Sequence, residues 1–251
     1  MPRQARKKST SGIYHVMLRG IDRQTIFEDE EDYLYFLEAI RQCREECGFK
    51  LYAYCLMGNH VHILLKEENV GLESIFKRIS GRYVYYYNAK YRRVGPLFQD
   101  RFKSEPVEND SYLLTVLRYI HQNPIKAKLC NEIEDYPYSS YSEYFHDSNI
   151  VDARFVLSVL SLEEYVRYNK EPNEDKCLEI TTSVRRAVTD QQARDIIEKY
   201  SHCRSLVEFQ HLDCKKKEQY IKKIYKKGVS IRQVSRLTGT SKGLVEKWLK
   251  S

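Results

Sequence analysis

The chain has 251 residues, of which 42% are hydrophobic, so it can bury a sizeable core and global disorder is excluded. Its formal net charge of +7 favours a polyanionic partner such as nucleic acid. Seven cysteines without a CxxC pair argue against a disulfide scaffold and against a cysteine-based zinc site. Because no signal-peptide core and no long apolar run is found, we expect a reduced, cytoplasmic and nucleoid-associated protein that does not enter a membrane.

The first half of the chain predicts strands and helices in alternation. A basic arm at residues 1–9 either lies on a phosphate backbone or stays solvated. Alternating or β-branched residues predict strands over 13–19, 49–57, 60–66 and 97–107. Apolar residues at helical spacing predict helices over 29–47, 72–93 and 111–122, with Pro124 ending the last. The order βαββαβ with a following helix predicts an α+β, ferredoxin-like fold with an antiparallel sheet.

Two histidines open the strand over residues 60–66, directly after a predicted Gly58-Asn59 hairpin turn. Strand side chains alternate between faces, so His60 and His62 point the same way. Two imidazoles on one face can bind one metal ion, but they do not complete its ligand shell. His15 in the first strand is a possible third ligand, although a lone strand histidine is more often packed or hydrogen-bonded.

The helix that follows the fourth strand offers the missing groups. Tyr119 and Asn123 are four residues apart and therefore share a helix face. If that face covers the two histidines, two imidazoles and one amide oxygen can bind Mg²⁺ or Mn²⁺, with positions left open for a phosphate oxygen. Tyr119 is then the nucleophile, and its product is a 5′-phosphotyrosine link with a free 3′-hydroxyl. Tyr112 and the tyrosines between 83 and 91 are rival nucleophiles, but neither comes with a ligand four residues later.

Basic residues and tyrosines are interleaved between residues 77 and 103, where eight Lys or Arg accompany one acid. Cations suit the phosphates of single-stranded DNA and aromatic rings suit its bases. The structural alternative is an amphipathic helix whose tyrosines pack at the edge of the core. The helix can bind DNA and pack some tyrosines inward at the same time. Arg19, at the end of the first strand, meets either a phosphate or a surface acid. The other basic candidates for DNA contact are Lys77, Arg78, Arg82, Arg92, Arg93, Arg101 and Lys103.

Three motifs resemble the HUH single-tyrosine transposases, most closely their REP-associated tyrosine transposase branch. They lie at residues 57–62 (MGNHVH), 95–102 (GPLFQDRF) and 118–124 (RYIHQNP), within a resemblance that spans roughly residues 10–145. The resemblance implies a ferredoxin-like fold and cleavage of single-stranded DNA near an imperfect hairpin. It also implies a divalent metal bound by His60, His62 and Asn123, with Tyr119 as nucleophile. Some relatives carry Gln at the last ligand position, but Gln122 is three residues after Tyr119, which favours Asn123.

The C-terminal part predicts a separate domain. We expect the catalytic domain over residues 1–146, a helical linker region over 147–180 and an all-helical domain over 181–251. One linker helix is expected over 152–169. The helices of the last domain are expected over 190–200, 205–209, 214–227, 231–238 and 242–249.

The last two helices flank a short turn and predict a helix-turn-helix. This end resembles the replication-initiator-like helical domain that is appended to some members of the same family. From residue 215 to residue 251, twelve basic residues oppose two acids. Ser241, Lys242 and Lys247 are therefore candidate contacts to duplex DNA. A basic bundle that binds a phosphate backbone or a protein is the alternative.

Together these features predict an enzyme: a metal-dependent single-stranded DNA endonuclease and strand transferase of the HUH tyrosine transposase class, cleaving near hairpins. We expect a monomer or homodimer that also holds adjacent duplex DNA. Two other classes stay open. One is a catalytically silent DNA-binding regulator derived from a transposase, and the other is an RNA-binding ferredoxin-like protein.

Overall fold

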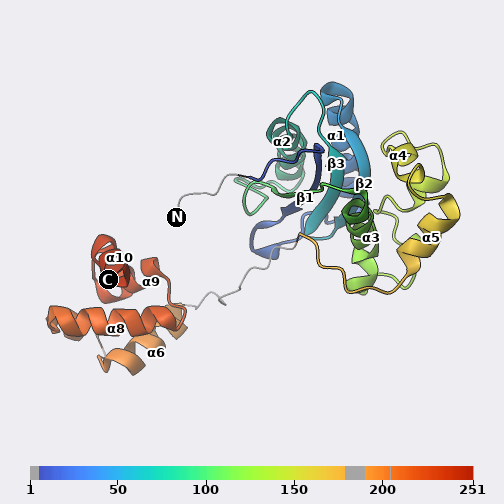
Figure 1. The fold of residues 1–251 in the computed structure, drawn as a ribbon. Coiled ribbons are helices and arrows are strands. Elements are labelled where there is room, and N and C mark those ends of the chain that lie inside the picture. The colour runs from blue at the N-terminus through green and yellow to red at the C-terminus, as the bar shows by residue number, and fades with distance from the viewer. Residues whose placement is uncertain (1–5, 179–189, 204, 251) are drawn as a thin grey trace. The chain divides into compact units, whose positions relative to one another are not determined.

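The structure, a computed structural model, describes residues 6–178, 190–203 and 205–250. The chain divides into two compact units, residues 1–179 and 180–251 (Figure 1). In the described ranges, no helix is long and apolar enough to cross a membrane. The first unit contains β1 (Ile13–Arg19), α1 (Glu30–Cys47), β2 (Lys50–Met57), β3 (His60–Lys66), α2 (Leu72–Lys90), β4 (Lys103–Pro106), α3 (Asp110–Lys126), α4 (Ala153–Leu157) and α5 (Leu162–Lys170), with 3-10 helices at Ile21–Arg23, Ile133–Asp135 and Ser142–Phe145.

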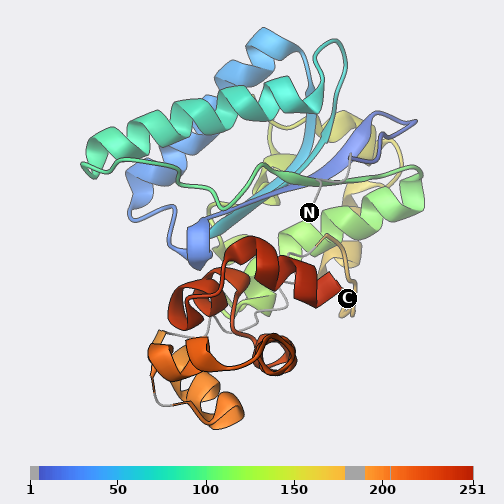
Figure 2. The same ribbon diagram turned by 90° about the vertical axis from the view of Figure 1, so that its left-hand side faces the viewer.

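The four strands form one sheet in the order β2-β3-β1-β4, and every neighbouring pair is antiparallel. Helices α1 and α2 cover one face, and α3 covers the other (Figures 1 and 2). The predicted α+β, ferredoxin-like fold is confirmed. The sheet therefore lies between two helical layers, and β1, β2 and β3 bury side chains on both faces.

Local sequence explains the ends of α1 and the β2–β3 hairpin. Asp29 accepts a hydrogen bond from the amide of Asp32 at 3.2 Å, and the Asp32 carboxylate accepts from the amide of Asp29 at 3.4 Å, which closes a capping box. Gly48 ends the helix with a left-handed backbone, φ 74°. The expected Gly58-Asn59 turn joins the two strands.

The prediction of one strand over residues 97–107 is wrong in its first part. The chain pairs with the end of β1 at Phe98 and again from Lys103 onwards. Between these points, the Asp100 side chain accepts a hydrogen bond from the amide of Arg101 at 2.8 Å. This local bond replaces the strand ladder, so Arg101 lies in a loop.

The prediction that Pro124 ends the last helix of the sheet domain is also wrong. Helix α3 runs through Pro124 to Lys126. A proline removes one amide donor, here the one that would bond the Ile120 carbonyl. The amide of Ala127 still donates to the Asn123 carbonyl at 2.9 Å, so the last turn keeps its other bonds. Asn123 therefore lies inside the helix and not at its end.

The single helix expected over residues 152–169 is two helices, α4 and α5. Ser161 starts the second one: its hydroxyl accepts from the amide of Glu164 at 3.3 Å, and the Glu164 carboxylate accepts from the amide of Ser161 at 2.9 Å. Val156 of α4 and Tyr165 of α5 are buried in the core of the first unit.

Residues 147–178 of the expected linker region thus pack on the first unit. Nδ1 of His121 on α3 lies 2.9 Å from Oδ1 of Asn169 on α5, and its Nε2 lies 2.9 Å from the hydroxyl of Ser140. Three stretches lie outside the described residues: residues 1–5 of the basic arm, residues 179 and 180 of the expected linker region, and residues 181–189 of the expected last domain.

We expect acid to destabilise the first unit through His121. Burial lowers the pKa of this imidazole from 6.5 to about 4, although the hydrogen bond to Asn169 acts in the opposite direction. In the unfolded chain the pKa stays near its ordinary value. The stabilising contribution is therefore complete above pH 6.5 and is lost as the pH falls towards 4, at a cost of about 3 kcal/mol.

Urea unfolding above pH 6.5 and at about pH 4 measures this loss. Near-ultraviolet circular dichroism of the tyrosines reports mainly on the first unit, whereas fluorescence of Trp248, the single tryptophan, reports on the second. The variant His121→Gln has no ring to titrate, so it should lose about 3 kcal/mol less than the wild type between the two pH values. Equal losses in the two proteins would contradict this expectation.

The second unit is helical in its described part. Ser230 and Gln233 form a capping box, Gly239 takes a left-handed backbone with φ 68°, and the Ser241 hydroxyl accepts from the amide of Leu244 at 3.4 Å. Val234, Val245 and Trp248 are buried in its core. Its helices are α6 (Asp190–Ser201), α7 (Leu206–His211), α8 (Cys214–Lys226), α9 (Ile231–Thr238) and α10 (Lys242–Lys250).

Candidate active site

His60 and His62 lie on the sheet face that α3 covers. Helix α3 packs on β2 and β3, the hairpin that carries both histidines (Figure 2). The ring centroids of His60 and His62 are 5.0 Å apart. His62 is 1% exposed, whereas His60 is half-buried. The strand alternation inferred from sequence therefore brings both imidazoles to one place beneath a helix.

A chain of hydrogen bonds runs from β4 through β1 to β3. Oε1 of Glu105 lies 2.9 Å from Nδ1 of His15, and Nε2 of His15 lies 2.9 Å from Nδ1 of His62. A carboxylate can only accept, so His15 donates from Nδ1. With one proton on each ring, His15 accepts at Nε2, and His62 donates from Nδ1 and keeps a lone pair at Nε2. Both nitrogens of His15 are thus engaged, which corrects its reading as a possible third ligand.

Asn59 fixes the tautomer of His60 in the way that His15 fixes that of His62. Its Oδ1 lies 2.6 Å from Nδ1 of His60, while its Nδ2 donates to the carbonyl of Arg23 at 3.3 Å. His60 therefore donates from Nδ1, and its Nε2 carries the lone pair. Burial, and then the charge of Arg19, lower the pKa of His60 to about 4. Burial, and then the neighbouring imidazoles, lower the pKa of His62 well below 6.5. Both rings are neutral at pH 7, the form that binds a metal ion.

Helix α3 brings Tyr119 to the same place, and Asn123 follows it by one helical turn. The ring centroid of Tyr119 lies 5.5 Å from that of His62 and 5.9 Å from that of His15, edge-on in both cases. Nδ2 of Asn123 donates to the Tyr119 carbonyl at 2.8 Å, so Oδ1 is left to act as an acceptor. One chain thus supplies both the histidine pair and the tyrosine helix. Tyr119 is 4% exposed and takes part in the core.

The donor atoms at this place suit a divalent ion. Among the residues that the structure describes, no three His, Cys, Asp or Glu side chains are grouped to hold a metal ion. A third protein ligand would therefore be of another type, and the amide oxygen of Asn123 is of that type. Two neutral Nε2 atoms and one amide oxygen fit an ion that keeps positions for water or substrate.

Lys126 is a candidate that the sequence analysis missed. Its Nζ lies 5.2 Å from the ring centroid of Tyr119 and 3.2 Å from Oδ1 of Asn173. The signal was present in the sequence, since Lys126 follows Tyr119 by seven residues, two helical turns on the same face. Because the helix was expected to end at Pro124, Lys126 was not placed on the helix face of Tyr119.

The rival residues on α3 have other partners. Tyr112 hydrogen-bonds Glu105 and Cys177, and burial raises the pKa of its hydroxyl. Gln122 faces the chain after α5: its Nε2 donates to the carbonyls of Asn169 at 2.6 Å and Glu171 at 3.0 Å. Gln122 is therefore committed to packing α3 against that segment, which leaves Asn123 as the candidate ligand.

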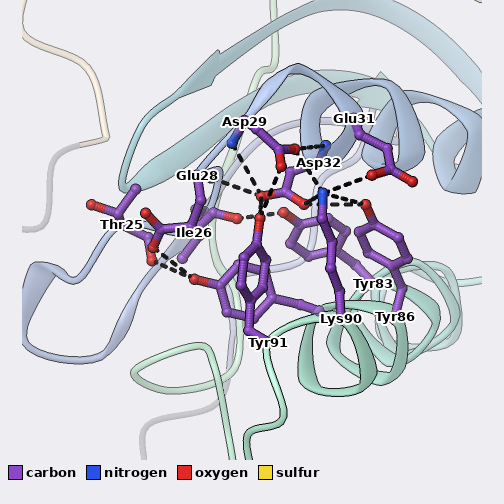
Figure 3. A network of polar contacts seen from close by, with 11 residues as sticks. Thr25, Ile26, Glu28, Asp29, Glu31, Asp32, Tyr83, Tyr86, Lys90 and Tyr91 are labelled. Carbon is purple, nitrogen blue, oxygen red and sulfur yellow. Dashed lines mark hydrogen bonds and ion pairs between the residues drawn. The ribbon is translucent and has the colours of Figure 1, made fainter.

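The tyrosine-rich helix α2 lies on the face of the sheet opposite to α3 (Figure 2). Its tyrosines bond the segment that starts α1, as Figure 3 shows. Tyr83 donates to the carbonyl of Ile26, and Tyr91 donates to Asp32 at 2.8 Å. Lys90 pairs with Asp32 at 3.0 Å. These rings are structural, whereas Tyr85 is exposed.

Helix α1 also neutralises two of the basic residues of α2. Arg78 pairs with Glu46 at 3.0 Å, and Arg82 pairs with the same carboxylate. Arg19, cross-strand from His60, and Lys103, cross-strand from Met17, lie instead on the face of the histidines.

The remaining basic candidates are spread over the surface. Arg101 lies 3.8 Å from Glu73, and the guanidinium of Arg93 lies 5.4 Å from the ring centroid of Tyr87. Lys77 and Arg92 have exposed side chains in the first unit, as do Ser241, Lys242 and Lys247 in the second.

Comparison with known proteins shows that part of the first unit is similar to transposases. Residues 8–123 match a family model described as "Transposase IS200 like". A curated protein of Haemophilus influenzae, described as a REP-associated tyrosine transposase, is 30% identical over 118 residues. The match covers 42% of this chain and 66% of that protein, so the chain spans slightly less than two thirds of this relative.

A solved structure shares the fold. It is described as a REP-associated tyrosine transposase bound to a REP hairpin, and it matches with a TM-score of 0.51 at 18% identity. The match covers 58% of this chain and 86% of that chain. The relatives are transposases, which are enzymes, in agreement with the predicted class.

Proposed function

We propose that this chain is a metal-dependent endonuclease and strand transferase for single-stranded DNA, with Tyr119 as its nucleophile. The observation that carries the proposal is the 5.5 Å separation between the rings of Tyr119 and His62, on the face that also holds His60. Burying polar groups around a tyrosine costs free energy that an apolar core would not require. A catalytic role accounts for that cost.

The metal would be Mg²⁺ or Mn²⁺. His60 and His62 would hold it through Nε2, and Asn123 through its amide oxygen. When bound, such an ion supplies Lewis acidity to the scissile phosphate.

Tyr119 performs the covalent step. Its hydroxyl oxygen bonds to phosphorus, the bond from phosphorus to the 3′ oxygen breaks, and a proton taken up by that oxygen balances the proton lost from the tyrosine. The downstream strand is then held as a 5′-phosphotyrosine, and the upstream strand ends in a free 3′-hydroxyl. Because the link is also a phosphodiester, another 3′-hydroxyl can attack it and rejoin the strands without ATP.

Lys126 would support this step. Its ammonium over the Tyr119 ring favours the negative charge that develops on the phenol oxygen. We expect Lys126→Met to slow adduct formation about tenfold at neutral pH, and Lys126→Arg, which keeps the charge, to lose less. Single-turnover cleavage measures both rates. Lys128→Met, an exposed lysine two residues later, is the matched control, and equal rates in the two Met variants would remove Lys126 from the mechanism.

Two observations support hairpin DNA as the substrate. The solved relative was bound to a REP hairpin. On this chain, Arg19 and Lys103 place positive charge on the face of the histidines, where a phosphate backbone would have to pass.

The second unit would hold duplex DNA next to the hairpin. Helices α9 and α10 flank a tight turn. Ser241, just before α10, and Lys242 and Lys247 on α10 are exposed. A helix-turn-helix presents its second helix to the major groove in this manner.

Incubation with a pool of 3′-labelled single-stranded hairpins with randomised flanks tests the proposal. The label must be on the 3′ side because that fragment stays linked. We expect an adduct that survives denaturant, needs Mn²⁺ or Mg²⁺, and is lost with EDTA. Reversible binding without any adduct would favour the silent regulator. Tighter binding of the same sequences as RNA would favour the RNA-binding protein.

A further inference from the structure

We infer that His15 and Glu105 are positioning residues for His62: they fix its ring and its tautomer so that Nε2 offers a lone pair at the face of Tyr119 and Asn123. The inference rests on the proposed function, because a ligand role for His62 gives this arrangement its purpose. It goes further by assigning two residues that touch neither the proposed metal nor the substrate.

The hydrogen-bond chain is buried and directional. His15 is fully buried and His62 nearly so, and both contacts, Glu105 to His15 and His15 to His62, measure 2.9 Å. They join β4 to β1 and β1 to β3, which are neighbours in the sheet. A buried imidazole that donates at one nitrogen and accepts at the other has one possible proton arrangement for a given direction of the chain.

Glu105 sets that direction. Its Oε1 also accepts from the amide of Leu178 at 2.9 Å, and Tyr112 donates to the same carboxyl group. Burial alone would raise the pKa of Glu105, but the hydrogen bonds of His15, Leu178 and Tyr112 lower it. The group is therefore a carboxylate, which accepts from every neighbour. With a single proton on each ring, the proton of His15 sits on Nδ1, and the proton of His62 then sits on its own Nδ1.

Packing alone does not account for the chain. Two apolar side chains would fill the space between β4 and β3 without the cost of burying two imidazoles. His121 provides the comparison, since it is equally buried but bonds Asn169 and Ser140 on the other side of α3. Partners beyond the ligand shell are what hold a metal-binding histidine in one orientation, and losing one typically lowers metal affinity about 10- to 100-fold.

The first test needs no metal. Nitrogen-15 NMR distinguishes the two imidazole tautomers, and the His62 signals are assigned by their loss in His62→Asn. We expect His62 to carry its proton on Nδ1 in the full chain. In His15→Leu this preference should disappear, whereas His15→Gln, whose amide can accept from His62 and donate to Glu105, should restore it. His62 protonated on Nε2 in the wild type would overturn the inference.

The second test is a Mn²⁺ titration of the same proteins by calorimetry. We expect His15→Leu and Glu105→Ala to bind Mn²⁺ about 10- to 100-fold more weakly than the wild type, and His15→Gln to recover most of the loss. His121→Gln is the matched control: it removes an equally buried imidazole and should lower stability without changing Mn²⁺ affinity. Thermal unfolding of every variant separates weaker binding from unfolding.

The outcomes separate the two claims. If the wild type binds Mn²⁺, His62→Asn does not, and His15→Leu binds as tightly as the wild type, the positioning role is wrong and the proposed function stands. If the wild type does not bind Mn²⁺ at all, the metal-dependent function is wrong, and the positioning role loses its purpose with it.

Discussion

Tyr119→Phe abolishes the covalent DNA adduct in the proposed mechanism, with a loss of at least about 10³-fold in adduct formation. The substitution removes one hydroxyl and keeps the ring, so the edge-on contacts with His62 and His15 remain. DNA binding and the unfolding temperature should therefore change little. Denaturing gels of the 3′-labelled hairpin pool measure the adduct, and band shifts measure the binding.

Tyr112→Phe is the matched control for this prediction. Tyr112 lies two helical turns before Tyr119 on α3 and hydrogen-bonds Glu105. Because Glu105 keeps its bonds to His15 and Leu178, the control should retain most of the adduct. Loss of the adduct in Tyr112→Phe, with retention in Tyr119→Phe, would exchange the roles of the two tyrosines.

His60→Ala and His62→Ala should each reduce metal-dependent cleavage by about 10²-fold or more, since each removes a nitrogen ligand. The two variants should differ in stability. His62 is buried and bonded to His15, so truncating it leaves an unpaired polar group and costs about 1–3 kcal/mol, whereas the half-buried His60 costs less.

Cleavage as a function of Mn²⁺ concentration measures the first effect, and urea unfolding measures the second. His121→Gln again serves as the control, because it destabilises the first unit without touching the histidine face. If His60→Ala or His62→Ala cleaves DNA at the wild-type rate at any Mn²⁺ concentration, the substituted residue is not a ligand of the metal.

Short-range periodicity made much of the site predictable from sequence. The strand period of two places His60 and His62 on one face, and the helical spacing of four places Tyr119 beside Asn123. The order of elements then indicated that the tyrosine helix could reach the sheet, and it does so within one chain. Each of these inferences depends on residues within one element or on the chain order of the elements.

What could not be predicted depends on contacts between residues far apart in sequence. His15 and Glu105 are 90 positions apart, and their contact follows from the register of β1 against β4. Tyr91 looked like a base-stacking residue because its partner, Asp32, lies 59 positions earlier on another helix. The sequence tells which side chains are basic or aromatic. It does not tell which distant residue neutralises or buries each of them.

Helix α3 shows how one local rule can hide a functional residue. Proline normally ends a helix, so the sequence placed the end before Lys126. Only the bond to one carbonyl is lost in the structure, and the helix keeps one further turn. That turn brings Lys126 to the ring of Tyr119.

The most direct test of the central claim is mass spectrometry of the adduct after digestion with trypsin. Cleavage after Arg118 and Lys126 releases residues 119–126, in which Tyr119 is the single tyrosine. We predict that this peptide carries the 5′-phosphorylated nucleotide, in the presence of Mn²⁺ and not of EDTA. A nucleotide on the peptide 104–118, which contains Tyr112, or on any other peptide, would contradict the assignment of Tyr119 as the nucleophile.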